Sequence, residues 1–344
     1  MHGMQQLKIR QIITETSNVK TFVLDSGEQK IDYKAGQYLT FVFDMHGHEV
    51  RRSYSIASSP VLDEPLAITF KRVQNGAVSR PLFDAAQEGD VLLTTGAAGF
   101  FVLPQQLERG VQLMFMAAGS GIVPIFSMIK TALHLHPGVP VVLIYSNRSE
   151  PDTIYYRELL QLQERFADTF RIQFLFSSSA NLMLARLNKE LVEVLVRQYA
   201  VVPLNNLRFY ICGPFAYMRM IEMELHTMGV RGEHLRKEQF ETIRPPVRVQ
   251  PPDKEAHRVE IRMKDVVHEL VVQYPVTILE AAKKKGIVLP YSCEVGKCGS
   301  CAALCLRGTV WMTSNEVLLN DEIRKGLVLT CTGFPVGGEV VLSL

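Results

Sequence analysis

The chain has 344 residues, of which 47% are hydrophobic, so it is long enough to form two or three globular domains with separate cores. The formal net charge of +2 is too small to indicate nucleic-acid binding, and no basic run with interleaved aromatic residues is present. The first residues contain no long apolar stretch, so we expect a cytoplasmic protein without a signal peptide or a membrane span.

The first quarter of the chain alternates short apolar runs with turn residues. Six runs at this spacing predict strands of an antiparallel β-barrel. The predicted strands cover residues 9–13, 21–24, 38–43, 51–57, 66–73 and 91–95.

The fourth predicted strand carries Arg52, Tyr54 and Ser55. An arginine can bind a phosphate, and a tyrosine offers a flat ring for stacking. The same residue types are also common on the solvated face of a strand, so this segment alone does not decide between the two interpretations.

A second segment follows about twenty residues later. Gly76, Val78 and Ser79 form a turn that leads into a short predicted helix. The free N–H groups and partial positive charge at that helix start favour a phosphate. Together the two segments predict a nucleotide-like ligand.

The two segments resemble the flavin-binding motifs of the ferredoxin-NADP reductase superfamily, whose members bind FAD or FMN in the barrel. The resemblance implies that Arg52 contacts the flavin phosphates, that Tyr54 stacks on or flanks the isoalloxazine, and that Ser55 lies near its reactive nitrogen. It also implies that Val78 and Ser79 complete the pyrophosphate site. The paired phosphate motifs favour FAD over FMN.

From residue 112 onward, apolar strands alternate with amphipathic stretches of helix length, which predicts a parallel sheet flanked by helices. Gly119, Gly121 and Pro124 follow the first of these strands, directly before a helix. Glycines there let the backbone approach a pyrophosphate. The predicted strands cover residues 113–118, 141–146, 172–176 and 207–212.

This loop resembles the pyridine-nucleotide loop of the same superfamily, and Cys212-Gly213-Pro214 resembles its second element. The resemblance implies that Cys212 positions the nicotinamide; the alternative is a buried thiol at a strand end. Glu238-Gln239-Phe240 resembles the segment that closes the nucleotide domain over the flavin, which adds Glu238 and Phe240 to the predicted site.

The choice of nucleotide depends on the end of the second strand of this sheet, where an acidic residue would accept the ribose hydroxyls. Ser146-Asn147-Arg148-Ser149 stands there, with no acid before Glu150. Arg148 therefore favours NADPH over NADH as the electron donor, since arginine accommodates a 2′-phosphate.

Three thiols lie within nine residues at Cys293, Cys298 and Cys301, and Cys331 follows. This C-x4-C-x2-C spacing with a distant fourth cysteine is typical of a plant-type [2Fe-2S] cluster. Gly296 lets the loop backbone approach the sulfurs. The alternatives are a zinc site, which more often uses two C-x2-C pairs or histidines, and incidental core cysteines.

The order of elements after residue 257 resembles the β-grasp of plant-type ferredoxins. It comprises a hairpin, a helix from Ile278 capped by Thr277, the cysteine loop, a short helix near residues 314–319 and closing strands. We expect Glu294 and Lys297 to flank an exposed cluster, where a protein acceptor docks. The expected domains are a flavin-binding β-barrel (1–106), an NAD(P)-binding α/β domain (107–243), a proline-rich linker (244–256) and a [2Fe-2S] ferredoxin-like domain of α+β class (257–344).

The predicted function follows from electron counting. A nicotinamide gives up two electrons as a hydride, a [2Fe-2S] cluster accepts one, and a flavin exchanges either number. The domain order resembles the reductase components of bacterial multicomponent oxygenases, of the phenylacetyl-coenzyme A oxygenase reductase type, which implies an oxygenase component as acceptor. Two alternatives stay open: a redox-sensing electron-transfer subunit, and a flavin reductase with a structural metal module.

Overall fold

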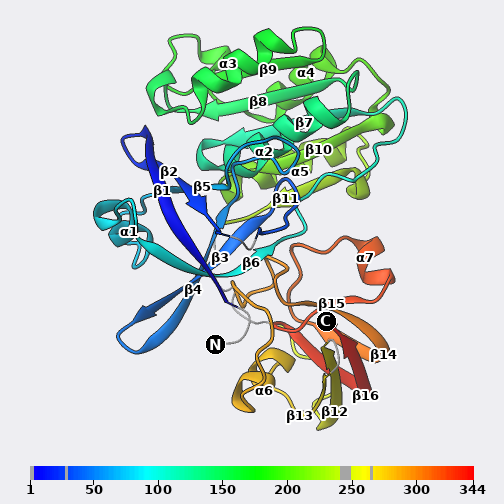
Figure 1. The fold of residues 1–344 in the computed structure, drawn as a ribbon. Helices are drawn as coiled ribbons and strands as arrows, with labels where there is room; N and C mark the ends of the chain where they lie inside the picture. Colours follow the sequence, from blue (N-terminus) through cyan, green and yellow to red (C-terminus); the bar gives the residue numbers. More distant parts are fainter. Residues whose placement is uncertain (1–3, 28–29, 241–248, 264–265) are drawn as a thin grey trace. The chain divides into compact units, whose positions relative to one another are not determined.

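The computed structural model describes residues 4–27, 30–240, 249–263 and 266–344, and the chain divides into two compact units, Met1–Gln239 and Phe240–Leu344 (Figure 1). The linker predicted over 244–256 lies partly outside the described residues; residues 249–256 are described and form neither helix nor strand. No helix in the described ranges has both the length and the apolar composition needed to cross a membrane.

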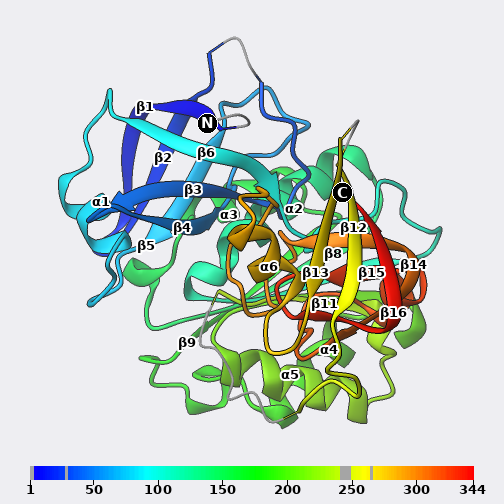
Figure 2. The same ribbon diagram turned by 90° about the horizontal axis from the view of Figure 1, so that it is seen from below.

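The first unit begins with the predicted six-stranded antiparallel sheet, in the order β4-β3-β6-β1-β2-β5. A bridge between Ile56 and Ile68 joins the two edges of this sheet and closes the barrel, whose strands curve around one another in Figure 2. Alternate side chains fill the interior, among them Phe22, Phe41 and Phe70. The elements are β1 (Gln5–Thr16), β2 (Val19–Asp25), β3 (Tyr38–Met45), β4 (His48–Ser55), β5 (Ala67–Lys71), α1 (Ser79–Ala85) and β6 (Val91–Ala98).

The second part of this unit is a five-stranded parallel sheet in the order β11-β10-β7-β8-β9. Its strands are β7 (Gln112–Ala118), β8 (Val141–Asn147), β9 (Phe170–Phe176), β10 (Leu207–Cys212) and β11 (Leu235–Glu238). Its helices are α2 (Ile122–Leu135), α3 (Tyr156–Arg165), α4 (Lys189–Tyr199) and α5 (Phe215–Thr227), with short 3-10 turns at Gly119–Gly121, Glu150–Asp152, Leu182–Leu184, Leu204–Asn206 and Gly232–His234.

Helices cover both faces of this sheet, because side chains alternate along each strand. Leu113 and Phe115 of β7 join a core cluster with α2 and α3, whereas Met114 and Met116 join a second cluster with α4 and α5. The strand order reverses between β7 and β10, so the loops after these two strands run in opposite directions. Parallel sheets of this kind bind ligands in the crevice that forms between such loops.

The second unit is a five-stranded mixed sheet in the order β13-β12-β16-β14-β15, with β12 and β16 parallel, as expected for the predicted β-grasp. Buried side chains of α6, among them Ile278 and Leu279, contribute its apolar face. The elements are β12 (His257–Met263), β13 (Val266–Val272), α6 (Ile278–Lys284), β14 (Ala302–Met312), α7 (Asn320–Arg324), β15 (Leu327–Leu329) and β16 (Gly333–Ser343).

The short helix predicted near residues 314–319 is wrong. The side chain of Asn315 accepts hydrogen bonds from the N–H groups of Val317 and Leu318, which folds this stretch into a turn. The helix begins at Asn320 instead, and Glu322 accepts the Leu319 N–H at its start.

The predicted cap of α6 is confirmed. Thr277 Oγ1 accepts the Glu280 N–H at 3.2 Å, and Glu280 Oε2 accepts the Thr277 N–H at 3.1 Å, which completes a capping box. We expect Thr277→Ala to lower the free energy of unfolding of this unit by about 1 kcal/mol, because one helix N–H loses its acceptor. Chemical denaturation of the full chain measures the loss, and Thr277→Ser, which keeps the oxygen, should stay close to the parent. Equal stability of the alanine and serine variants would contradict the prediction.

Candidate functional site

The predicted flavin strand is β4, and its side chains leave one buried polar group without a partner. The Tyr54 ring packs 5.1 Å from the Phe70 ring, and no described residue hydrogen-bonds its buried hydroxyl. Burial raises the pKa of Tyr54 to about 12, so the hydroxyl is neutral and able to donate. Arg52, two residues away, is exposed. An unsatisfied hydroxyl beside an exposed cation fits an oxygen-rich ligand such as the predicted flavin.

Ser55 of the barrel and Glu238 of the parallel sheet are brought together in the first unit. Ser55 Oγ lies 3.5 Å from Glu238 Oε2, and both side chains are buried. Glu238 is the last residue of β11, which pairs with β10 next to Cys212. The structure thus unites two predicted site residues 183 positions apart. Phe240, a further predicted residue, begins the second unit and is 45% exposed.

The predicted phosphate turn has a compact geometry. A Cβ atom at Gly76 would lie 2.2 Å from Ser79 Oγ, so a larger residue there would displace the Ser79 hydroxyl. Ser79 Oγ accepts the Val73 N–H at 3.3 Å, and Val78 is buried. The Ser79 hydroxyl therefore holds the turn together. Its role in binding a pyrophosphate stays a prediction.

The two predicted nucleotide segments meet at the reversal point of the parallel sheet. Cys212 pairs with Ala117 in the neighbouring strand, and a Cβ atom at Gly121 would lie only 2.1 Å from the Cys212 carbonyl oxygen. Gly119 has a φ of +54°, a left-handed conformation that favours glycine, and its carbonyl accepts the Tyr145 hydroxyl at 3.0 Å. The backbone conformation therefore favours glycine at position 119, and the close approach to Cys212 requires it at position 121. Pro124 is buried in the first turn of α2, and Gly213 and Pro214 lead into α5.

The Cys212 thiol is fully buried, and burial raises its pKa well above the usual value. It is therefore protonated and shielded, which suits a positioning residue and not a nucleophile. Arg148 follows the end of β8, is exposed, and accepts the Ser178 N–H through its carbonyl oxygen. The roles of both residues stay predictions.

The four predicted ligand cysteines are associated two by two. The Cys293 N–H donates to Cys298 Sγ at 3.5 Å, and the pKa of the Cys301 thiol is lowered by its hydrogen bond with Cys331. Across the described ranges, no three His, Cys, Asp or Glu side chains converge on one ion. These four thiols provide the number and kind of ligands that the predicted [2Fe-2S] centre requires.

The loop backbone donates to the sulfurs as its glycines predict. The N–H groups of Val295 and Lys297 point to Cys293 Sγ at 3.5 and 3.4 Å, on either side of Gly296. Gly296 has a φ of +80°, and a Cβ atom there would lie 2.6 Å from the Ser314 carbonyl oxygen. Such N–H donors stabilise charge on a bound thiolate.

Lys297, which we expect to flank an exposed cluster, has a largely buried side chain. Its side chain is only 8% exposed, and its ammonium lies 3.9 Å from Glu316. Glu294, which has a φ of +58°, is partly exposed and bonds Lys283 of α6 at 2.8 Å, while Lys283 lies over the Tyr291 ring. The charged side chains of the cysteine loop therefore bind partners within the second unit. The same turn that directs backbone N–H groups toward the sulfurs also directs these side chains toward the unit.

Comparison with known proteins identifies three domains in the chain. Three family models match: Oxidoreductase FAD-binding domain over residues 5–102, Oxidoreductase NAD-binding domain over 115–223, and 2Fe-2S iron-sulfur cluster binding domain over 262–336. The chain therefore carries binding domains for FAD, a nicotinamide nucleotide and a [2Fe-2S] cluster, as the sequence predicts. The cluster match also favours iron over the zinc alternative.

Relatives match over nearly their whole length. The 3-ketosteroid-9-alpha-monooxygenase ferredoxin reductase component of Rhodococcus rhodochrous is 32% identical, covering 97% of this chain and 96% of the relative. One of the subunits of the 1,2-phenylacetyl-CoA epoxidase of Escherichia coli strain K12 is 29% identical, covering 100% and 98%. The solved structure of phthalate dioxygenase reductase shares the fold, with a TM-score of 0.61 and 23% identity over 99% of this chain and 98% of that chain.

Two features of the first unit are not predicted by the sequence analysis. β11 has only four residues, Leu-Arg-Lys-Glu, and no apolar run to mark it as a strand. A buried polar network between the barrel and α2 is the second. Its signal was present, because Ser127, Lys130 and Thr131 interrupt an otherwise apolar helix at positions that share a face.

Proposed function

The chain belongs to the family of oxygenase reductase components that join FAD-binding, NAD-binding and [2Fe-2S] domains, and from this premise we propose that it passes electrons from NADPH to a partner oxygenase component. When bound, the flavin converts the two-electron donation of the nicotinamide into single-electron steps for the cluster. The observation that carries the proposal is the cysteine loop, whose backbone N–H groups point to the Cys293 and Cys298 sulfurs, in a chain that also has both nucleotide-type sites.

The residues of the first unit have separate roles in this proposal. Arg52, with Gly76, Val78 and Ser79 of the turn, binds the flavin phosphates, and Tyr54 donates its free hydroxyl to the flavin. Gly119 and Gly121 let the backbone approach the nicotinamide nucleotide. Cys212 and Glu238, adjacent at the strand ends, shape the place where the nicotinamide meets the flavin. No side chain has to act as an acid or a nucleophile.

We extend the proposal to organisation and location. The domain limits 1–106, 107–243, 244–256 and 257–344 agree in order with the three matched regions, which supports them. Free thiols as cluster ligands are typical of a reducing compartment, which supports a cytoplasmic location.

The acceptor is tested by rapid mixing of the NADPH-reduced chain with an isolated oxygenase component, and separately with cytochrome c as a nonspecific one-electron acceptor. We expect the oxygenase component to be reduced faster than cytochrome c. Slow reduction of both, with normal reduction of the chain by NADPH, would contradict an oxygenase partner and favour the redox-sensing alternative.

The nucleotide preference is tested at Arg148. We expect Arg148→Glu to lower kcat/KM for NADPH roughly 10- to 100-fold, because one charge-assisted hydrogen bond is lost. The value for NADH should stay the same or rise, because an acidic residue at this position accepts the ribose hydroxyls. Steady-state kinetics with both nucleotides measure the ratio. Arg171→Glu is the matched control, since Arg171 lies near the opposite end of the same sheet. Equal effects of Arg148→Glu on both nucleotides would contradict the assignment.

A further inference from the structure

Helix α2 presents a polar face although the helix is buried. Ser127, Lys130 and Thr131 are spaced i, i+3 and i+4, so they lie on one side of the helix, and all three are buried. Polar groups in such a place are retained only when they have partners.

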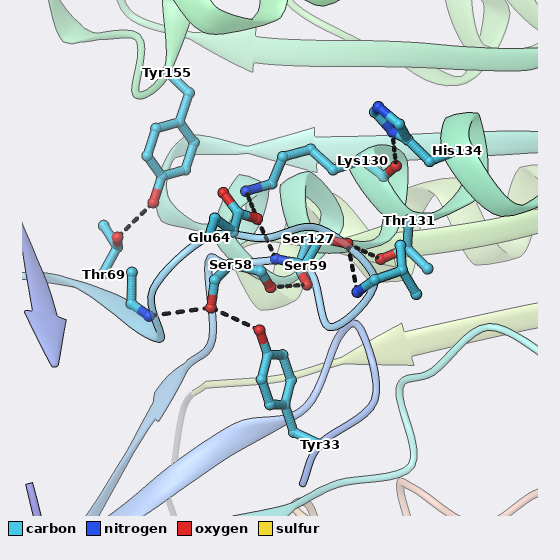
Figure 3. A network of polar contacts seen from close by, with 12 residues as sticks. Tyr33, Ser58, Ser59, Glu64, Thr69, Ser127, Lys130, Thr131, His134 and Tyr155 are labelled. Carbon is cyan, nitrogen blue, oxygen red and sulfur yellow. Dashed lines mark hydrogen bonds and ion pairs between the residues drawn. The ribbon is translucent and has the colours of Figure 1, made fainter. Parts of the chain in front are cut away.

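All three partners come from one segment of the barrel, residues 58–64. Ser127 Oγ donates to the Ser58 carbonyl oxygen at 2.6 Å, and Thr131 Oγ1 and Ser59 Oγ share a hydrogen bond of 2.7 Å. Figure 3 shows these side chains pointing toward one another, with Lys130 reaching Glu64. The Lys130 Nζ to Glu64 Oε1 distance is 2.6 Å.

Segment 58–64 is itself fixed by hydrogen bonds to other residues of the barrel. Ser58 Oγ accepts the Tyr33 hydroxyl at 2.8 Å and the Ala67 N–H at 3.1 Å. The carboxylate oxygen of Glu64 that binds Lys130 also accepts the Ser59 N–H. Segment 58–64 is therefore held by hydrogen bonds within the barrel as well as by its bonds to α2.

A second contact lies at Tyr155, before α3. Its ring stacks on Phe126 of α2 with 4.3 Å between centroids. Its hydroxyl donates to Thr69 Oγ1 of β5, as Figure 3 shows. Tyr155 has a φ of +58°, a conformation that costs energy in a non-glycine residue. Two separate contacts fix rotation as well as distance between the barrel and the parallel sheet.

The polar contact between α2 and segment 58–64 fixes the relative position of the two elements more than it stabilises their association. Burial lowers the pKa of Lys130 and the Glu64 carboxylate opposes that shift, so the ion pair forms against a desolvation cost. Two apolar surfaces could pack against each other in several relative positions, whereas hydrogen bonds with defined directions are satisfied in only one of them. Buried polar networks that are fully satisfied specify a single arrangement.

Both ligand segments lead directly into this contact. Segment 58–64 begins three residues after Ser55, and α2 begins directly after Gly121. We propose that segment 58–64 and the Ser127, Lys130 and Thr131 face of α2 form a joint that holds the nucleotide loop in register with the flavin strand, with Lys130 and Glu64 as positioning residues for hydride transfer. This inference rests on the proposed function, because it needs a nicotinamide and a flavin in those sites.

The test compares Lys130→Met and Glu64→Gln in the full chain loaded with FAD and cluster. Rapid mixing with NADPH gives the limiting rate of flavin reduction, the Kd for NADPH, and the long-wavelength charge-transfer absorbance of stacked nicotinamide and flavin. We expect each variant to lower the limiting rate about 10-fold or more and to weaken the charge-transfer band, with Kd within about twofold, because small misplacements cost rate and not binding. Lys130→Arg keeps a cation and should recover most of the rate.

Val192→Ala is the matched control for lost stability, since Val192 is a fully buried residue of α4 in the other core cluster. It should lower the Tm without slowing flavin reduction. Unchanged limiting rates in Lys130→Met and Glu64→Gln, or an equal loss in Val192→Ala, would overturn the joint. Failure of the parent chain to be reduced by NADPH would instead refute the proposed function. If Lys130→Met does not fold, the nearly isosteric Glu64→Gln decides.

Discussion

Cys331→Ser is expected to abolish electron delivery to any one-electron protein acceptor while leaving flavin reduction by NADPH intact. Cys331 is buried and is associated with Cys301, so its loss leaves one iron of the pair with a single thiolate. The cluster should then not assemble, and bound iron should fall to background. The first unit contains both nucleotide-type sites and is compact by itself, so its chemistry should continue.

Iron, sulfide and FAD analyses of the purified variant measure this result, together with rapid mixing with NADPH and then with cytochrome c. Circular dichroism checks that the second unit stays folded, because cluster binding and folding are coupled in small domains. Cys305→Ser is the control, since Cys305 on β14 directs its thiol to the Arg307 carbonyl oxygen and not to the other cysteines. Full iron content in Cys331→Ser would show that the fourth ligand is misassigned.

Gly121→Ala is expected to lower the rate of flavin reduction by NADPH about 100-fold. The added Cβ would lie 2.1 Å from the Cys212 carbonyl oxygen and 2.8 Å from the Gly213 nitrogen, which are backbone atoms of the facing strand end. Either the loop or that strand end must move to relieve this overlap. A displacement of about an ångström between reacting groups costs about two orders of magnitude in rate.

Rapid mixing with NADPH measures this effect, with FAD content and cluster absorbance expected to match the parent chain. Gly232→Ala provides the control, because among the described residues beyond its chain neighbours only a His226 carbon, 3.9 Å away, lies within 4 Å of the added Cβ. A parent-like rate in Gly121→Ala would mean that the approach of the two loops does not determine where the nicotinamide lies.

The sequence predicts the fold well where the period of the apolar residues and the spacing of the turn residues mark the strands. The six strands of the barrel and the first four strands of the parallel sheet appear near their predicted residues, because apolar runs and turn residues mark them. Family resemblance adds the order of domains, which periodicity alone does not supply. The misplaced helix near residues 314–319 shows the limit, since the Asn315 side chain selects a turn over a helix in a stretch of similar composition.

The candidate site is predictable as a set of segments but not as a set of contacts. The sequence predicts that glycines 119 and 121 let the backbone approach a pyrophosphate, and it does not indicate that Gly121 and Gly296 face the carbonyl oxygens of Cys212 and Ser314. The sequence did not foresee that Lys297 is buried beside Glu316, because nothing local indicates where a lysine side chain turns. Nor did it pair Lys130 with Glu64, since partners 66 residues apart are joined only by the tertiary fold.

The most direct test of the three-centre reductase is an anaerobic titration of the purified chain with NADPH, followed by visible absorption and accompanied by iron, zinc and flavin analysis. One FAD and one [2Fe-2S] cluster together accept three electrons, so we expect both absorptions to bleach with an end point near about 1.5 equivalents of NADPH. Bleaching of flavin alone with an end point at about one equivalent, in a chain that contains zinc and no iron, would contradict the account.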